Sequence, residues 1–155
     1  MIIIYCIGYV HSDTMTFLNE EKNTLKALFY SIDKGFEIIY GYRFFMIDLN
    51  LIMRENTRLH SQFLHIEKLR FAMYKEKIDT LISEGILKKE STHNEYTFLI
   101  KQIRILSDYW VASAQIYDAT ENITNTITSY SCLLKQLFFP YLTEKGKRLY
   151  AELIG

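Results

Sequence analysis

The chain has 155 residues, enough for one domain, and its 49% content of hydrophobic residues can supply a sizeable core. One proline and six glycines argue against a turn-rich β-architecture and favour long helices. Lysine plus arginine equals aspartate plus glutamate at 18 each, and this balance argues against a chain that binds nucleic acid by itself.

The N-terminal segment, residues 1–19, has no clear structural assignment. Its opening MIIIYCIGYV is rich in β-branched residues, as a strand would be, but the rest of the sequence offers no partner strand. The run is too short to span a bilayer and lacks the basic start of a signal peptide. The two cysteines, Cys6 and Cys132, are far apart, so we expect reduced thiols and a cytoplasmic protein. Because the sequence offers neither a membrane span nor a signal peptide, we also expect no membrane contact.

A helical domain is predicted over residues 20–155. Its first helix covers residues 24–40, where apolar residues recur every three or four positions from Leu25 to Ile39. Asn19, followed by two glutamates, favours a helix start, and Gly41 ends the pattern.

Residues 42–55 predict a second helix, within the stretch YGYRFFMIDLNLIMREN. At about 100° per residue, Arg43 and Arg54 share a stripe that can face water. Asp48 falls on the other side, among large apolar residues, and is expected to need a charged partner there. The apolar run carries three charges and is too short for a membrane span.

A long helix is predicted over residues 58–84, with Gly85 as a left-handed C-terminal cap. Glu67 and Arg70 project three residues apart from its apolar side, close enough to interact. The next helix covers residues 95–118, with Asn94 as its expected cap. It has two apolar stripes, so both sides of this helix must be covered. The first stripe contains Leu99, Ile103, Leu106, Trp110, Ala114 and Tyr117, and the second contains Phe98, Ile105, Tyr109, Ala112 and Ile116.

Residues 123–139 predict a further helix with an apolar seam typical of helical bundles. The seam consists of Ile123, Ile127, Tyr130, Leu134 and Leu137. Pro140 ends this helix, and Thr143 caps a last one. The expected fold class is therefore all-α, a bundle of about six helices.

The residues that carry chemistry are sparse. His60 and His65 are five positions apart and point about 140° away from each other on one helix, so they do not form a metal site. No phosphate-binding glycine loop and no nucleophile motif is present. We expect no catalytic residues, no metal, no cofactor and no enzymatic activity. Asp48, Glu67 and Arg70 form either a structural ion pair between helices or the polar part of a ligand cavity.

Three stretches of the sequence resemble one family. YGYRFFMIDLNLIMREN, the helix that ends EGILKKE, and NEYTFLIKQIRILSDYWVASAQIY are similar to the C-terminal domain of tetracycline-repressor (TetR) family transcriptional regulators. The likeness is strongest to a branch of the family associated with Bacteroidetes, since LTEKGKRLYAEL resembles the closing helix of that branch. It covers residues 20–155. It implies a domain that binds a small effector and dimerises, with its last long helices forming a four-helix bundle across the dimer.

The resemblance favours the cavity interpretation of the polar residues. The expected lining for a small amphipathic effector, not identified by the sequence, is Tyr40, Phe44, Phe45, Asp48, Phe63, Glu67, Arg70, Tyr74, Tyr109 and Trp110. The apolar stripes independently suggest a homodimer through the helices at 95–118 and 123–139. Its expected interface is Phe98, Ile105, Tyr109, Ala112, Ile116, Ile123, Ile127, Tyr130, Leu134 and Leu137.

The N-terminal segment departs from the family pattern, because residues 1–19 contain nothing like a DNA-recognition helix. We therefore expect this chain to lack the helix-turn-helix domain, to sense and dimerise, and not to bind DNA directly. A stand-alone helical homodimer without a ligand is the alternative. A small helical enzyme or lipid carrier is a more remote one.

Overall fold

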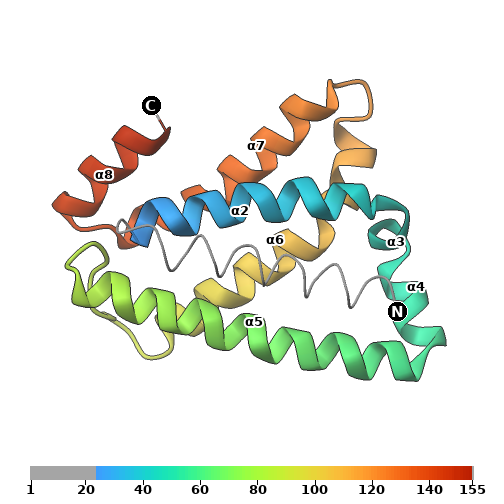
Figure 1. Cartoon of the computed structure of the whole chain (residues 1–155), viewed down its shortest axis with the longest axis horizontal. Helices are drawn as coiled ribbons and strands as arrows, with labels where there is room; N and C mark the ends of the chain where they lie inside the picture. Colours follow the sequence, from blue (N-terminus) through green and yellow to red (C-terminus); the bar gives the residue numbers. More distant parts are fainter. Residues whose placement is uncertain (1–23, 155) are drawn as a thin grey trace.

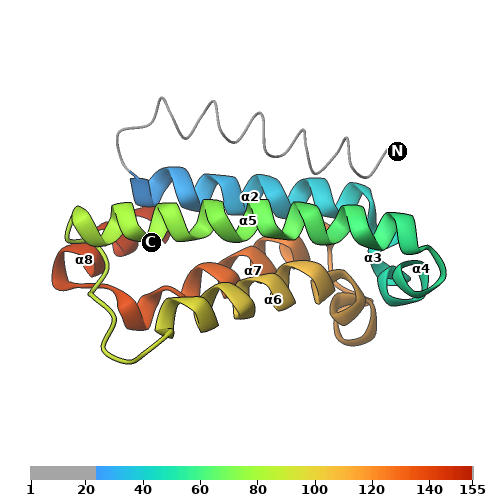
Figure 2. The same cartoon turned by 90° about the horizontal axis from the view of Figure 1, so that it is seen from below.

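The computed structural model describes residues 24–154, which fold into helices packed in two layers (Figure 1, Figure 2). One layer contains α2 (Thr24–Gly41) and α5 (Thr57–Ser83), which lie side by side. The other contains α6 (Glu95–Tyr117) and α7 (Ile123–Gln136). The all-α helical bundle predicted from the sequence is confirmed.

Shorter elements close the two ends of this arrangement (Figure 1). At one end α3 (Arg43–Ile47) and α4 (Leu49–Glu55) connect the two helices of the first layer. At the other end, a 3-10 helix, η1 (Phe139–Tyr141), leads into α8 (Glu144–Ile154). The expected helix start at Asn19 lies outside the described residues.

The single helix predicted over residues 42–55 is wrong, because the chain breaks at Asp48. This residue has φ −98° and ψ 17°, which separates α3 from α4. Aspartate is a poor helix former, since its side chain competes for nearby backbone groups. The break turns the chain toward the start of α5 and leaves the Asp48 side chain exposed. Asp48 is therefore not on a buried side of a helix, as the sequence predicted.

Both ends of α5 carry well-formed caps. At its start the Asn56 side chain accepts a hydrogen bond of 2.9 Å from the Leu59 N–H. At its end Gly85 adopts φ +70°, and the Ile86 N–H bonds the Leu81 carbonyl at 2.9 Å. This is the paired closure of a Schellman motif, and it confirms the left-handed cap predicted at Gly85.

The start of α6 is closed in a different way from the prediction. Asn94 occupies the capping position, but its φ of 62° is left-handed and its side chain makes no capping hydrogen bond. The Glu90 carboxylate instead accepts a hydrogen bond of 3.0 Å from the Tyr96 N–H. Glu95 reaches back to the Ser91 N–H at 2.7 Å. Glu90 thus satisfies an amide that Asn94 was expected to bind, while Glu95 ties the preceding turn to the start of the helix.

The connection from α7 to α8 is held against the end of α5. Helix α7 ends at Gln136, three residues before the predicted end. Leu142 forms an isolated antiparallel bridge with Leu87, and the Thr143 hydroxyl accepts a hydrogen bond of 3.1 Å from the Gly146 N–H. The predicted cap at Thr143 is confirmed.

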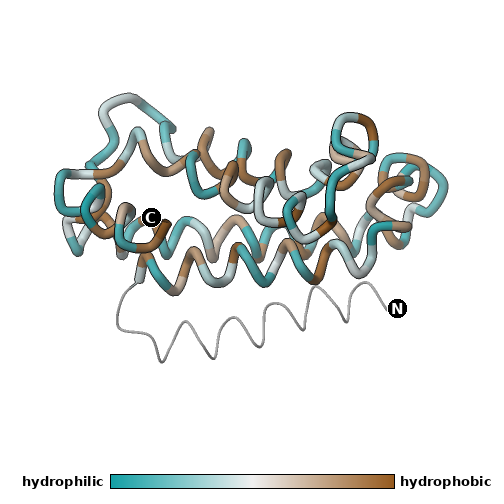
Figure 3. The backbone as a smooth tube through the Cα atoms, turned by 90° about the horizontal axis from the view of Figure 1, so that it is seen from above, coloured by the Kyte–Doolittle hydropathy of each residue, from teal (hydrophilic) through white to brown (hydrophobic). Residues whose placement is uncertain are grey.

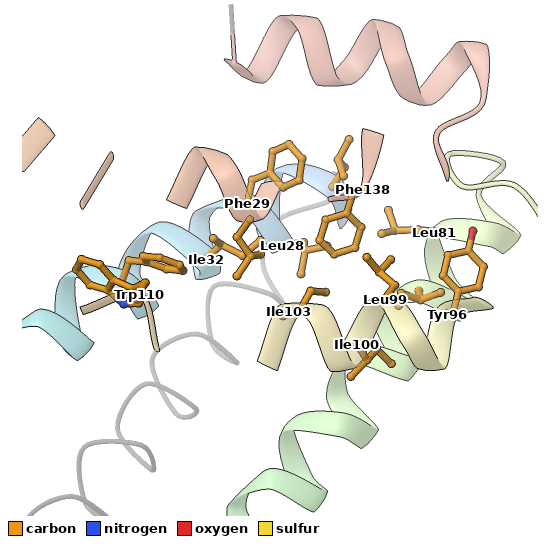
Figure 4. Close-up of a cluster of buried hydrophobic side chains, with 14 of the residues drawn as sticks. Leu28, Phe29, Ile32, Leu81, Tyr96, Leu99, Ile100, Ile103, Trp110 and Phe138 are labelled. Carbon is orange, nitrogen blue, oxygen red and sulfur yellow. The ribbon is translucent and has the colours of Figure 1, made fainter. Parts of the chain in front are cut away.

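The core lies between the two layers (Figure 4). Polar and apolar residues alternate along the helices, as the teal and brown segments of Figure 3 show, so each helix buries one side. The largest fully buried side chains are Trp110, Phe36, Phe138, Leu25, Leu28, Ile78, Leu81, Leu87, Leu99, Ile103, Leu134 and Leu142.

Candidate functional site

Helix α6 presents three different faces, and the candidate site is built around it. One face lies in the core, where Leu99, Ile103 and Trp110 are at most 1% exposed. A second face packs against α5 and carries the buried Asp108. The third carries large apolar residues that remain exposed. The two-striped sequence of this helix therefore corresponds to two distinct surfaces in the fold.

Four charged residues form a cluster between α5 and α6. Arg70 Nη1 lies 3.0 Å from Asp108 Oδ1 and 2.7 Å from Glu67 Oε1. Arg104 completes the cluster from α6, with its Nε 3.7 Å from Glu67 Oε2. One guanidinium, that of Arg70, therefore serves two carboxylates, each at most 14% exposed. Glu67, Arg70 and Asp108 depend on one another for stability, because each of these three charges has lost most of its water.

The Glu67 carboxylate is the least satisfied member of this cluster. Burial raises its pKa, and the nearby charge of Arg70 opposes that rise. Its Oε1 is buried and receives no hydrogen bond from the described residues, although Arg70 Nη1 is close. That nitrogen donates instead to Asp108 Oδ1. A buried acceptor without a donor is uncommon in native proteins and marks a place for a further polar group.

A small open cavity lies at this cluster. Its volume is about 10 Å³, room for about one water molecule. Burial raises the pKa of the Tyr74 hydroxyl in its wall, so this group stays protonated at neutral pH. The lining residues are Glu67, Arg70, Phe71, Tyr74, Ile100 and Arg104.

The ten residues predicted to line one aromatic cavity do not come together. Three of them, Glu67, Arg70 and Tyr74, line the α5–α6 cavity. Phe45 and Trp110 are buried in the core, while Tyr40 and Phe63 are partly buried against it. The remaining three side chains are exposed, namely Phe44, Asp48 and Tyr109.

An aromatic cluster occupies the part of the core where the larger cavity was expected. The Trp110 ring stacks on Phe36 with 5.2 Å between ring centroids. Tyr40 and Tyr130 flank it at 6.3 Å and 5.6 Å. The Tyr130 hydroxyl is tied to Asp118 by a hydrogen bond of 2.9 Å. These rings fill space that a ligand would otherwise occupy, because aromatic side chains of this size pack densely.

The second stripe of α6 is largely uncovered. Phe98, Ile105 and Ile116 are 54%, 58% and 73% exposed. Between them, Tyr109 donates a hydrogen bond of 2.9 Å to Asn50 in α4, and Ala112 is partly buried. An apolar surface of this kind on a water-exposed helix is typical of a protein–protein interface.

The predicted seam of α7 is directed mainly toward its own subunit. Leu134 is fully buried, and Ile127, Tyr130 and Leu137 pack against the core, so they belong to the contact of α7 with its neighbours in the bundle. Among the five seam residues only Ile123 is classed as exposed. The sequence pattern therefore identified the buried side of α7 rather than a free one, because intramolecular and intermolecular contacts share the same spacing.

The family comparison decides what kind of domain this is. A family model described as a bacterial transcriptional repressor, TetR, matches residues 12–150, which include α2 to α7 and most of α8. The chain belongs to the TetR family. No curated protein and no solved structure matches it significantly.

Sequence reasoning missed two residues in the charged cluster of this TetR-family domain, Arg104 and Asp108. Both residues fall with Lys101 and Gln115 on the face of the predicted helix at 95–118 that lies outside its two apolar stripes. Part of that face is covered by α5, where Arg70 meets Asp108 rather than Asp48. No local signal distinguished them, because an arginine and an aspartate four residues apart are also common on a solvated helix face.

The described part of the TetR-family domain contains neither a metal site nor a membrane-spanning helix. Within residues 24–154, no group of three or more histidine, cysteine, aspartate or glutamate side chains is placed to hold a metal ion. None of the helices in that range has the length and apolar character required to cross a membrane.

Proposed function

We propose that this TetR-family domain senses a small effector and forms a homodimer, without enzymatic activity, a cofactor or direct contact with DNA. The observation that carries the proposal is the position of α6. One of its faces borders the polar cavity against α5, and another exposes an apolar stripe. A single rigid helix thus connects a candidate ligand site to a candidate subunit interface.

The dimer would form when the exposed stripe of α6 meets its equivalent on a second copy. From Phe98 to Ile116 the stripe extends over about 27 Å of helix, at 1.5 Å per residue. Covering a few hundred Å² of apolar surface per subunit contributes several kcal/mol, at roughly 25 cal/mol per Å², before the costs of association. A twofold axis pairs the same surface on both copies.

Outward residues of α7 would extend this interface in place of its buried seam. Leu133 is 48% exposed and lies next to the fully buried Leu134. Ile123, at the other end of α7, is also exposed. We therefore propose α6 as the main contact, with Leu133 and Ile123 at its edge. Leu134 has a structural role within the subunit.

The sensing role rests on the polar cavity and on its connection to the interface. Asp108 and Tyr109 are consecutive in α6 but point to different neighbours, Arg70 in α5 and Asn50 in α4. A ligand that displaces the charged cluster would therefore act on the same turn of α6 that carries Tyr109. A shift of α6 at this turn would also move the residues of the dimer interface, because both lie on the same helix. A helix with two such positions is the kind of two-state element that regulation requires.

A stand-alone homodimer without a ligand is the second candidate. It is favoured by the small volume of the cavity, about 10 Å³. Effectors larger than water would have to displace side chains at its mouth, where Phe71 and Arg104 are exposed. The two candidates share the dimer and differ only in whether the cavity opens for a ligand.

Sedimentation equilibrium tests the dimer at micromolar concentration. We expect the wild-type chain to sediment as a dimer, and Ile105→Glu and Ile116→Glu to sediment as monomers with unchanged helical circular dichroism. Gln115→Glu is the matched control, because this neighbouring residue is exposed but lies off the stripe. A monomeric wild type excludes the dimer, and a dimer that survives both stripe variants assigns it to another surface.

A thermal-shift screen tests the sensing role separately. Small aromatic molecules with positive, zero and negative charge are added in turn, and at least one class is expected to raise the unfolding temperature. If no class does so while the chain remains a dimer, the stand-alone homodimer is the better description.

A further inference from the structure

We propose that the α5–α6 cavity binds a ligand through a cationic nitrogen, which pairs with Glu67. This inference rests on the proposed sensing role and names the chemical class of the effector.

The deep part of the site already has one more carboxylate than cation. Arg70 is placed against both Glu67 and Asp108, at 2.7 Å and 3.0 Å, and its Nη1 donates to Asp108. Its charge is therefore shared between two anions. An added carboxylate or phosphate would meet two buried carboxylates of its own sign, which disfavours an anionic ligand.

The unsatisfied atom in this deep part is an acceptor. Glu67 Oε1 is buried and lacks a hydrogen-bond donor among the described residues. Only a group that carries N–H or O–H can satisfy it, and a charged N–H does so about twice as strongly as a neutral one. The cavity next to this atom gives such a donor a place to sit.

Arg104 marks where the cation of the ligand would be. Its side chain is 47% exposed, and its Nε lies 3.7 Å from Glu67 Oε2, beyond hydrogen-bond distance. This arginine balances the charge of Glu67 loosely from the mouth of the cavity. A ligand ammonium can take over that role at shorter distance while the Arg104 side chain moves into solvent, which costs little for an exposed group.

The cavity has room for about one water molecule, so only the nitrogen of such a ligand would enter it and the rest would lie against the side chains around its mouth. Phe71 and Tyr74 supply aromatic rings from α5, and Ile100 supplies an aliphatic side chain from α6. Aromatic faces attract cations, and the apolar surface accommodates a hydrocarbon body. An amine attached to a small ring or short chain combines both properties.

Three probes that differ only in charge test this inference on the full chain. Benzylamine is cationic at pH 7, benzyl alcohol is neutral and benzoate is anionic, while their ring is the same. Titration followed by amide NMR is expected to show benzylamine shifting the signals of Phe71, Ile100 and Arg104, with weak or no shifts from benzoate.

Substitutions then assign the binding to Glu67. Glu67→Gln should weaken benzylamine binding about tenfold, the loss expected for one charge-assisted hydrogen bond. Glu76→Gln is the matched control, since this exposed residue lies on the same helix and outside the cavity. Arg104→Gln should tighten benzylamine binding severalfold, because it removes the competing cation. As an exposed position, Arg104 tolerates this change without a risk to folding.

The outcomes separate this inference from the proposed function. Tighter binding of benzoate or equal binding of all three probes overturns the charge preference but leaves sensing in place. Benzylamine binding that is unchanged in both Glu67→Gln and Arg104→Gln overturns the assigned partner. If none of the three probes shifts the cavity signals, the site itself is wrong. Should the screen described above still find a stabilising molecule, sensing takes place elsewhere.

Discussion

Arg70 in α5 donates a hydrogen bond of 3.0 Å to Asp108 in α6, and this ion pair joins two helices across 38 residues of sequence. Glu67, one turn before Arg70, lies against the same guanidinium at 2.7 Å. Arg70 is therefore the centre of the cluster, because its guanidinium contacts both carboxylates.

The stability of the domain should depend more on Arg70 than on Asp108. Arg70→Met leaves two buried carboxylates without their cation and should lower the free energy of unfolding by about 3–5 kcal/mol. Asp108→Asn keeps an acceptor of similar shape and leaves Arg70 paired with Glu67, so it should cost only about 1–2 kcal/mol. Urea denaturation measures both, with Arg58→Met at an exposed position of α5 as the control. Equal losses for the two variants would contradict the central position of Arg70.

Glu67 should make the domain less stable as the pH rises. Its pKa is raised by burial, so the folded state holds this proton more tightly than the unfolded state. The corresponding stability is present below pH ~4, where unfolded glutamate is protonated, and is lost as the pH rises through the folded pKa. Wild type should therefore lose stability relative to Glu67→Gln as the pH rises from about 4 through the folded pKa of Glu67. Urea midpoints across that range check the sign, and a difference that does not change with pH refutes it.

Gly146 should not tolerate a methyl group. A Cβ at this position would lie 2.3 Å from the Ile86 carbonyl oxygen and 3.0 Å from Leu142 Cδ2. Gly146→Ala should destabilise the domain by about 1–3 kcal/mol, because the backbone of the neighbouring segment would have to move. Gly35→Ala in α2 is the control, since no described atom lies within 4 Å of its added methyl. That change should stabilise by about 0.5–1 kcal/mol through helix propensity. Thermal unfolding of the two variants should shift in opposite directions.

Leu133 and Leu134 should separate the two sides of α7. Leu134 is fully buried, so Leu134→Ala should cost about 2–5 kcal/mol of stability. Leu133 is 48% exposed, and Leu133→Ala should cost less than about 1 kcal/mol in a monomer. Unfolding is compared in the monomeric Ile116→Glu background so that the dimer does not contribute. Similar losses at both positions would mean that α7 is rotated from the orientation described.

Several local features were readable from the sequence because they depend on neighbouring residues alone. The recurrence of apolar residues every three or four positions placed α2, α5, α6 and α7 within a few residues of their observed bounds. Gly85 identified the end of α5, since a left-handed residue there favours glycine. The sequence also showed that α6 has two apolar stripes, and in the fold most of one is buried while much of the other is exposed.

Partners and orientations were decided only by the tertiary structure. Helical periodicity says which residues share a side of a helix, but it carries no information on what that side meets. The sequence therefore offered Asp48 as a partner for Arg70, whereas the packing of α5 on α6 supplies Asp108. It likewise gave no means to decide that Leu134 packs inward while Ile116 stays exposed, since both belong to regular apolar stripes. That distinction depends on contacts between residues far apart in the chain, which form only when the helices assemble.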